Sequence, residues 1–282
     1  MSIELINQAI QKGAKLYSSV SGGKDGQAMT AALISRGMNI EGLIHADLGS
    51  IEWADSLPMC QMLADKYNIP LHIVTRHDGL GMVEYWAKRM QTLEGKNTPF
   101  WSSSKSRYCT SDLKRAPIDK FLNSTGHKLI ISCEGLRADE SAARSKKQPL
   151  SIRHNSSTFY KGMTVEEAIT NYRPDKKLIL TYYPIFNFST GDVWETFGMN
   201  IQNLQEAKNH YQTYNTVPAW WPFHPAYVYG NERVSCMFCV LGSLNDLKTA
   251  AKHNPALLDE LIGMEQASGF TFKNKFSLTS LK

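Results

Sequence analysis

Short apolar runs alternate with amphipathic stretches along most of the chain. Runs rich in Leu, Ile and Val have the length of buried strands at 16–20, 40–46, 71–75, 128–133 and 178–183. Apolar residues at helical spacing occupy 3–12, 27–35, 52–67, 81–94 and 112–122. Pro117 lies inside the last of these and predicts a kink or a late helix start. Strands that alternate with helices predict an α/β fold on a doubly wound parallel sheet.

The alternation ends near residue 200. Helical patterns return at 201–211 and 241–266 without a further strand. We therefore predict an α/β domain over 1–200 and a mainly helical C-terminal part over 201–282. The basic, polar interval 145–177 has little periodicity, and its pattern does not decide between an ordered lid and a mobile loop.

Composition narrows the class of protein. The 282 residues are 42% hydrophobic and 10% aromatic, which is ordinary for a globular protein. A net charge of +5 suits an anionic ligand but falls short of a dedicated nucleic-acid binder. The polar first residues do not resemble a signal peptide, and no apolar run approaches the roughly 18 residues of a membrane span. We therefore expect a cytoplasmic protein with no membrane association.

The end of the first predicted strand carries the clearest chemical signal. There the chain reads Ser19-Val20-Ser21-Gly22-Gly23-Lys24-Asp25-Gly26 and passes through a glycine turn into a helix. Backbone N–H groups at a helix N-terminus bind phosphate, and glycine permits close approach and positive φ. A Walker A loop would need glycine at 18 and Ser or Thr at 25, so this is another kind of phosphate loop.

Several loop residues are therefore candidate nucleotide contacts. They are Ser19, Ser21, Gly22, Gly23, Lys24, Asp25 and Gly26. Asp25 is expected to cap the following helix, to hold Mg²⁺ beside the phosphates, or to do both. Asp47 and Gly49 follow the second strand, and the carboxyl ends of parallel strands share one edge of a sheet. We expect them to contact the nucleotide or a metal ion.

The loop resembles the SGGKDS loop of the PP-loop ATP pyrophosphatases, the adenine nucleotide α-hydrolase superfamily. Further motifs resemble, in order, those of the phosphoadenosine phosphosulfate (PAPS) reductase family. They are His45-x-Asp47-x-Gly49, Cys109-x₄-Lys114, Gly135-x-Arg137-x₂-Glu140-Ser141 with Arg144, Asp192-Val193-Trp194 after Pro184, and Arg233-x-Ser235-Cys236-x₂-Cys239. The resemblance spans about residues 17–240. It implies a Rossmann-like fold of the adenine nucleotide α-hydrolase type, which binds ATP with Mg²⁺ and cleaves it between the α- and β-phosphates.

The chain departs from the family pattern at three places. Gly26 replaces the last serine of the loop, which removes one hydroxyl contact to phosphate. No cysteine follows Cys239, so we expect that the family's tail-thiol route to PAPS reduction is excluded. The tandem Cys-Cys of adenylyl-sulfate (APS) reductases is Tyr108-Cys109 here.

Five cysteines, an odd number, argue against a disulfide framework. By the resemblance, Cys109, Cys236 and Cys239 are candidate ligands of a [4Fe–4S] cluster with one open iron. Two alternatives remain: a zinc ion completed by His224 or His210, and buried thiols that bind nothing. Cys60 and Cys133 are expected in the core, and either remains a candidate fourth ligand.

Basic residues after the fourth strand suggest anion binding. Gly135 and Arg137 are expected at the nucleotide, and Arg137 and Arg144 would share a helix face if one helix carried both. With Lys24 and Asp25, these arginines are the candidate catalytic residues.

Three other groups are expected to have structural roles. Lys146, Lys147 and Arg153 are expected on a solvated face, with contact to a nucleic-acid backbone as the alternative. The aromatic segment 211–229 is expected to cover the cysteines, with stacking on nucleic-acid bases as the alternative. His45, His72 and His77 are expected to be packing or polar-edge residues.

Together these features predict an enzyme that adenylylates a substrate, releases pyrophosphate and transfers sulfur from an iron–sulfur site. An APS- or PAPS-binding reductase and a sulfate adenylyltransferase-like enzyme are alternatives. A third is a non-catalytic nucleotide-binding module that acts with a partner complex. The partners are thus ATP or an adenylyl-sulfate-type nucleotide, and a nucleic acid or a nucleic-acid-modifying complex. The sequence names neither the acceptor nor the oligomeric state, and a homo-oligomer is compatible with it.

Overall fold

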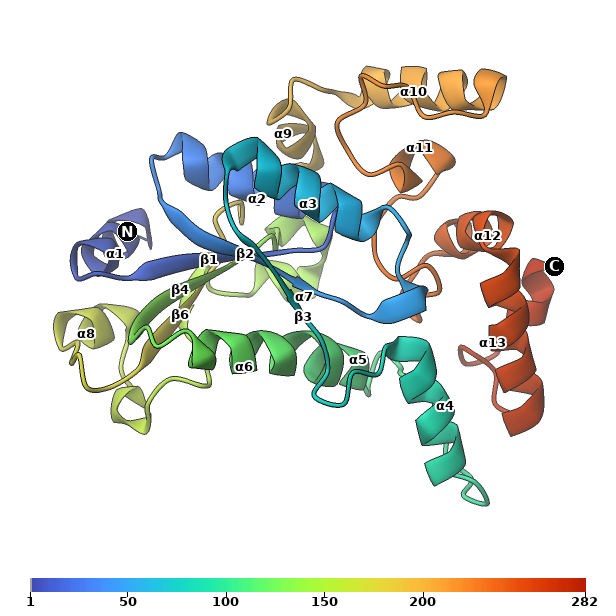
Figure 1. Cartoon of the computed structure of the whole chain (residues 1–282), viewed down its shortest axis with the longest axis horizontal. Coiled ribbons are helices and arrows are strands. Elements are labelled where there is room, and N and C mark those ends of the chain that lie inside the picture. Colours follow the sequence, from blue (N-terminus) through green and yellow to red (C-terminus); the bar gives the residue numbers. More distant parts are fainter. Residues whose placement is uncertain (1) are drawn as a thin grey trace.

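The computed structural model describes residues 2–282 and has three layers around one sheet (Figure 1). The strands are β1 Lys15–Val20, β2 Ile40–Ala46, β3 Leu71–Val74, β4 Leu129–Glu134, β5 Leu150–Ile152 and β6 Leu178–Tyr182. Their order is β3-β2-β1-β4-β6-β5, and every pair is parallel except β5 with β6. The predicted doubly wound α/β fold is confirmed, with one antiparallel edge strand that the sequence pattern did not indicate.

Helices cover both faces of the sheet. The longer ones are α1 Ser2–Gln11, α2 Lys24–Ser35, α3 Ser56–Tyr67, α4 Met82–Thr92, α6 Ala116–Ser124, α8 Val165–Thr170, α9 Thr190–Glu195, α10 Ile201–Tyr214, α12 Leu244–His253 and α13 Pro255–Ser268. Single turns form α5 Tyr108–Thr110, α7 Ala142–Ser145 and α11 Ala226–Tyr229. Short 3₁₀ helices lie at Gly49–Ile51, Ala138–Glu140, Thr158–Tyr160 and Leu278–Leu281. No helix within residues 2–282 combines the length and apolarity that crossing a membrane requires.

Side-chain alternation along the strands divides the core into two layers. On one face, Leu16, Leu43, Ile131 and Leu180 pack with residues of α1, α2, α3 and α8. On the other, Tyr17, Ile44, Ile130 and Ile179 pack against α6. Burial on both faces explains why the parallel strands are nearly continuous apolar runs.

The predicted late start at Pro117 is confirmed. Ser111–Arg115 forms a π-helical turn, and α6 begins at Ala116. Pro117 is the second residue of α6, where its missing N–H breaks no helical hydrogen bond.

The interval 145–177 is ordered around the sheet edge. It contains β5, and it contains α8, which begins with a capping box between Thr164 and Glu167. The T-x-x-E pattern that signals such a helix start is present in the sequence. β5 has no comparable local signal, because its three residues are held by pairing with β6.

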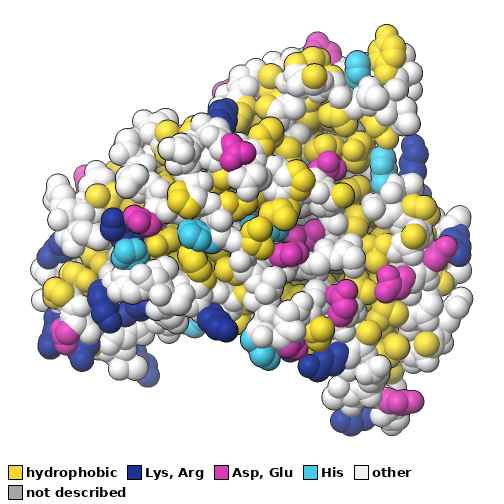
Figure 2. All heavy atoms as spheres, viewed as in Figure 1, with side chains coloured by type: hydrophobic (Ala, Val, Ile, Leu, Met, Phe, Trp, Pro, Cys, Tyr) yellow, Lys and Arg dark blue, Asp and Glu magenta, His cyan; other side chains and the backbone are white. Residues whose placement is uncertain are grey.

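Hydrophobic clusters cross position 200. One joins Trp86 and Leu113 to Phe238, Leu261 and Phe272. Another surrounds Trp194 with aromatic residues of the C-terminal part. In Figure 2, hydrophobic side chains gather on the side of the molecule formed by α10 to α13. The boundary near residue 200 stays a prediction.

Glu265 of α13 anchors the last residues of the chain. Its buried carboxylate accepts hydrogen bonds from Phe272 N, from Leu278 N at 2.9 Å and from Ser277 Oγ at 2.7 Å. In the same segment, Lys273 Nζ donates to Gly242 O at 2.6 Å, three residues after Cys239. The anchored segment therefore supports the loop that carries the CxxC pair.

We predict that Glu265→Gln lowers the free energy of unfolding by about 1–3 kcal/mol, because the amide nitrogen cannot accept and leaves a buried donor unpaired. Chemical denaturation would measure it. The control is Glu260→Gln, an exposed carboxylate on the same helix, which should change stability by less than about 0.5 kcal/mol. Equal effects of the two variants would contradict the anchoring role.

Candidate functional site

A cavity opens at the carboxyl ends of the strands. Its volume is about 530 Å³, within the roughly 300–1,000 Å³ of small-ligand sites. Residues at the ends of β1, β2, β4, β5 and β6 line it, among them Ser19, Ser21, Ile44, Glu134, Ser151 and Thr181. This is the edge at which doubly wound sheets bind ligands. The predicted contacts Ser19 and Ser21 both face this cavity.

The phosphate loop connects β1 to α2. Gly22 has a φ of +73°, and a Cβ there would lie 2.6 Å from the carbonyl oxygen of Ser56. Only glycine satisfies both constraints. Gly23 is the N-cap of α2 and has no side-chain capping bond. Asp25 therefore does not cap the helix, so that part of the expectation is wrong.

Lys24 is almost completely buried at the first turn of α2. Its Nζ lies 3.4 Å from Asp25 Oδ2, 5.1 Å from the centroid of the Tyr227 ring and 5.6 Å from that of Trp194. Burial lowers the pKa of Lys24, Asp25 opposes this shift, and Arg137 adds to it. A positive charge in such surroundings attracts an anion more strongly than one in water.

Arg137 joins the loop after β4 to the start of α2. Its Nε donates to Asp25 Oδ1 at 2.7 Å, and its Nη1 donates to Asp139 Oδ1 at 2.6 Å. The Arg137 side chain is 3% exposed. Gly135 makes this approach possible, because a Cβ there would lie 2.8 Å from the carbonyl oxygen of Asp25. The structure thus brings the predicted residues Asp25, Gly135 and Arg137 together.

Arg137 and Arg144 would share a helix face only if one helix carried both, and the structure shows that none does. Arg137 precedes the 3₁₀ turn Ala138–Glu140, and extended backbone at Ser141 separates that turn from α7, which carries Arg144. Glu140 connects them instead. Its carboxylate accepts from Arg137 N at 3.2 Å, from the Arg144 guanidinium and from Arg233 Nη2 at 3.3 Å.

A second cavity of about 380 Å³ lies beside the same loop. Its lining includes the cations Lys24, Arg137, Lys208 and Arg233 and the aromatic residues Trp194 and Tyr227. Ser19 and Ser21 face the first cavity, whereas Lys24 and Arg137 face the second. The phosphate loop therefore contributes residues to two cavities.

The aromatic segment covers the phosphate loop more than the cysteines. Trp221, Phe223 and Tyr227 form a buried cluster with Trp194 of α9. Lys24 N donates to Tyr227 Oη at 3.0 Å, which ties the start of α2 to α11. Sequence analysis missed Tyr227 as a site residue, because it lies 203 residues from Lys24.

Asp47 and Gly49 lie at the end of β2, as predicted for this edge. Asp47 Oδ1 accepts from Gly49 N at 2.8 Å.

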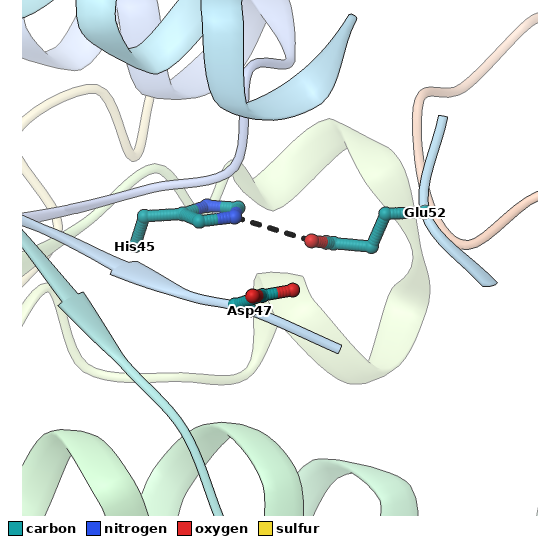
Figure 3. A group of neighbouring side chains, drawn as sticks. All are labelled: His45, Asp47 and Glu52. Atoms are coloured by element: carbon teal, nitrogen blue, oxygen red, sulfur yellow. Dashed lines mark hydrogen bonds and ion pairs between the residues drawn. The ribbon is translucent and has the colours of Figure 1, made fainter. Parts of the chain in front are cut away.

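His45 is not merely a packing residue. Its Nε2 lies 3.1 Å from Glu52 Oε2 (Figure 3). Its Nδ1 lies 3.3 Å from Val20 O and 3.6 Å from Cys60 Sγ. Burial lowers the pKa of His45, but the interactions with Cys60 and Glu52 outweigh it and raise the pKa to about 10.

Cys109, Cys236 and Cys239 all lie near Lys114. Burial lowers the pKa of Lys114, and the negative charges of the three thiolates and Glu52 reverse this, so that the pKa is raised. Burial also raises the pKa of Cys236 to about 12, so a metal would have to displace its proton. Lys114 also lines the first cavity.

The candidate zinc ligand His224 has both ring nitrogens engaged, Nδ1 by Ala226 N at 3.1 Å and Nε2 by Ser56 Oγ at 3.4 Å. A zinc ion completed by His224 would therefore have to displace one of these contacts. The metal-binding role of the three cysteines stays a prediction.

Arg153 is not on a solvated face, and that expectation is wrong. It is 7% exposed, and it pairs with Asp119 at 2.7 Å and with Glu134 at 2.8 Å while lining the first cavity. Lys146 and Lys147 are exposed, as expected.

We predict that Gly135→Ala weakens ATP binding and costs about 1–3 kcal/mol of stability, because the added methyl meets backbone atoms that cannot give way. Gly263→Ala, on the exposed face of α13, is the control, because a Cβ there would meet no atom within 4 Å. Thermal unfolding and calorimetric titration with ATP would separate the two variants; equal behaviour would contradict the close-approach argument.

The raised pKa of His45 gives a pH prediction. Its stabilising charge is complete below the ordinary value of 6.5 and is lost as the pH rises through about 10. In the presence of a chelator, the stability difference between the wild type and His45→Gln should therefore shrink over that range. Denaturation at several pH values measures this. A constant difference would contradict a charged, buried His45.

A family model described as the phosphoadenosine phosphosulfate reductase domain matches residues 15–219. The chain is similar to a crystal structure of PAPS reductase from Candida auris in a phosphate complex, with 16% identity and a TM-score of 0.46. That match covers 83% of this chain and 86% of that chain. No curated protein matches. Because the family model covers well over half of the sequence, the chain belongs to the PAPS reductase family of nucleotide-binding PP-loop enzymes.

Proposed function

We propose that the protein binds ATP across the phosphate loop, adenylylates an acceptor and then supports sulfur transfer to it. The observation that carries the proposal is the position of the loop, which lines one cavity with hydroxyls and another with cations. The cations beside Lys24 and Arg137 suit phosphates, and the isoleucines and hydroxyls of the first cavity suit an adenosine, so ATP could bind across the loop.

The first cavity suits the adenosine. Ile44, Ile118 and Ile152 provide apolar walls for a flat base. The hydroxyls of Ser151 and Thr181 lie on the same lining and can bond to the ribose or to the edge of the base.

The cations Lys24 and Arg137 at the second cavity suit the triphosphate. An acceptor oxygen would attack the α-phosphorus, the bond from that phosphorus to the bridging oxygen would break, and pyrophosphate would leave with its electron pair. Lys24 and Arg137 would stabilise the charge that develops on the leaving group. Arg144, held by Glu140, would add to this field.

Mg²⁺ would accompany ATP. Arg137 engages one oxygen of Asp25 and Lys24 the other. We therefore expect phosphate oxygens and waters to hold most of the ion's coordination sphere, while Asp25 orients the two cations.

The cysteine site lies beyond the first cavity. Cys109, Cys236 and Cys239 would hold a [4Fe–4S] cluster, which when bound supplies an iron able to carry the sulfur that replaces AMP. Lys114 would position an anion between the thiols and the nucleotide, because it is close to both.

Family membership favours a second candidate, an enzyme whose nucleotide is APS or PAPS. Competitive calorimetry with ATP and APS distinguishes the two. Tight binding of APS without measurable binding of ATP would overturn the proposal.

The test of the sulfur-transfer part is anaerobic purification with quantification of iron, sulfide and zinc. We expect about four irons and absorbance near 400 nm. Cys109→Ala should remove the colour and leave ATP binding unchanged. The control Cys133→Ala, at a buried position in the core, should keep the colour. A colourless wild type that binds ATP and releases no pyrophosphate with DNA or tRNA would instead favour the non-catalytic module.

A further inference from the structure

We propose that His45, Asp47 and Glu52 form a binding site for a divalent first-row transition-metal ion at the carboxyl end of β2. The site has no cysteine ligand, although Cys60 Sγ lies 3.6 Å from His45 Nδ1, and it does not depend on bound nucleotide. One ligand atom of each of the three residues lies within 4.8 Å of the others (Figure 3).

The spacing of these atoms suits coordination. His45 Nε2 and Glu52 Oε2 are 3.1 Å apart. Two adjacent ligands of an octahedral ion with bonds of about 2.1 Å lie about 3.0 Å apart. Asp47 uses Oδ1 for the N–H of Gly49, so its carboxylate is already oriented at the strand end. An ion that displaces the proton on His45 Nε2 could therefore replace the His45–Glu52 contact with little movement of either side chain.

The surroundings of His45 orient it as a ligand. Its side chain is 1% exposed, and Nδ1 lies 3.3 Å from the carbonyl oxygen of Val20. A carbonyl oxygen only accepts, so Nδ1 donates to it and Nε2 points toward Glu52. Metal-binding histidines ordinarily have this arrangement, with one nitrogen bonded to a carbonyl and the other directed at the ion.

The donor set selects the kind of ion. One imidazole nitrogen with two carboxylates suits Mn²⁺ or Zn²⁺, whereas Mg²⁺ prefers oxygen ligands alone. Thiolates, in contrast, favour Zn²⁺ and iron–sulfur clusters. Mn²⁺ therefore probes this site with little interference from Cys109, Cys236 and Cys239.

The site borders the first cavity. Glu52 lines that cavity, and so does Ala46, which lies between His45 and Asp47 in the sequence. Three protein ligands leave coordination positions for water or for an oxygen of a bound molecule. Lys114 lies near Glu52 and its charge opposes the ion, while the second carboxylate, Asp47, compensates.

The test is titration of chelator-treated, nucleotide-free protein with Mn²⁺, followed by the loss of the free-ion EPR signal. We expect one ion per chain in the wild type. Glu52→Gln and Asp47→Asn should each weaken binding by at least about tenfold, the lower end of what losing even an outer partner of a metal ligand causes. Glu41→Gln, a carboxylate at the start of β2 that pairs with Lys15, should bind like the wild type.

Circular dichroism would establish that each variant is folded. No Mn²⁺ binding by the wild type would overturn the proposal. So would equal binding by folded Glu52→Gln and Asp47→Asn, or binding that occurs only when ATP is added. Normal ATP affinity in a variant that no longer binds Mn²⁺ would show that the ion site and the proposed nucleotide site bind their ligands independently. Failure of one proposal would then not imply failure of the other.

Discussion

The ion pair between Arg137 and Asp25 is the contact on which the site depends. A guanidinium that is almost fully buried requires a partner, because an unpaired buried charge is strongly destabilising. The pair can form because Gly135 lets the chain after β4 pass directly over the start of α2. One contact therefore fixes the loop after β4, the first turn of α2 and the position of Lys24 relative to Arg137. The cations that face the second cavity are arranged by the fold before any ligand arrives, which is the condition for strong electrostatic stabilisation.

The C-terminal part completes this arrangement from the other side. Tyr227 accepts a hydrogen bond from the backbone of Lys24, and the cluster around Trp194 and Phe223 covers the loop. The same part of the chain carries Cys236 and Cys239, close to Lys114 at the first cavity. Packing of the C-terminal part against the sheet therefore connects the phosphate loop to the segment that carries the two cysteines.

Local patterns predicted the parts of the fold that local interactions determine. The parallel strands could be predicted because both their faces are buried, which makes them apolar runs in the sequence. The phosphate loop could be recognised because the conformation and close packing of its backbone require glycine. β5 was missed because three residues in a polar stretch become a strand only through β6.

The wrong assignments of several site residues have the same cause. Arg153 is buried through Asp119 and Glu134, which precede it by 34 and 19 residues. His45 was assigned to packing or to a polar edge, because its partner Glu52 is brought back only by the turn at Gly49–Ile51. Arg137 and Arg144 would have shared a face only on one continuous helix, whereas Glu140 connects them through a break. In each case a contact between separate elements decides the role.

The most direct test of the account is a crystal structure with α,β-methylene ATP, which cannot be cleaved between the α- and β-phosphates. The account predicts adenosine in the cavity that Ile44, Ser151 and Thr181 line, with the α-phosphate at Ser21–Gly23. The outer phosphates should lie against Lys24 and Arg137. A nucleotide bound with its phosphates away from the loop would contradict the account, as would a triphosphate that leaves the Arg137 side of the loop untouched.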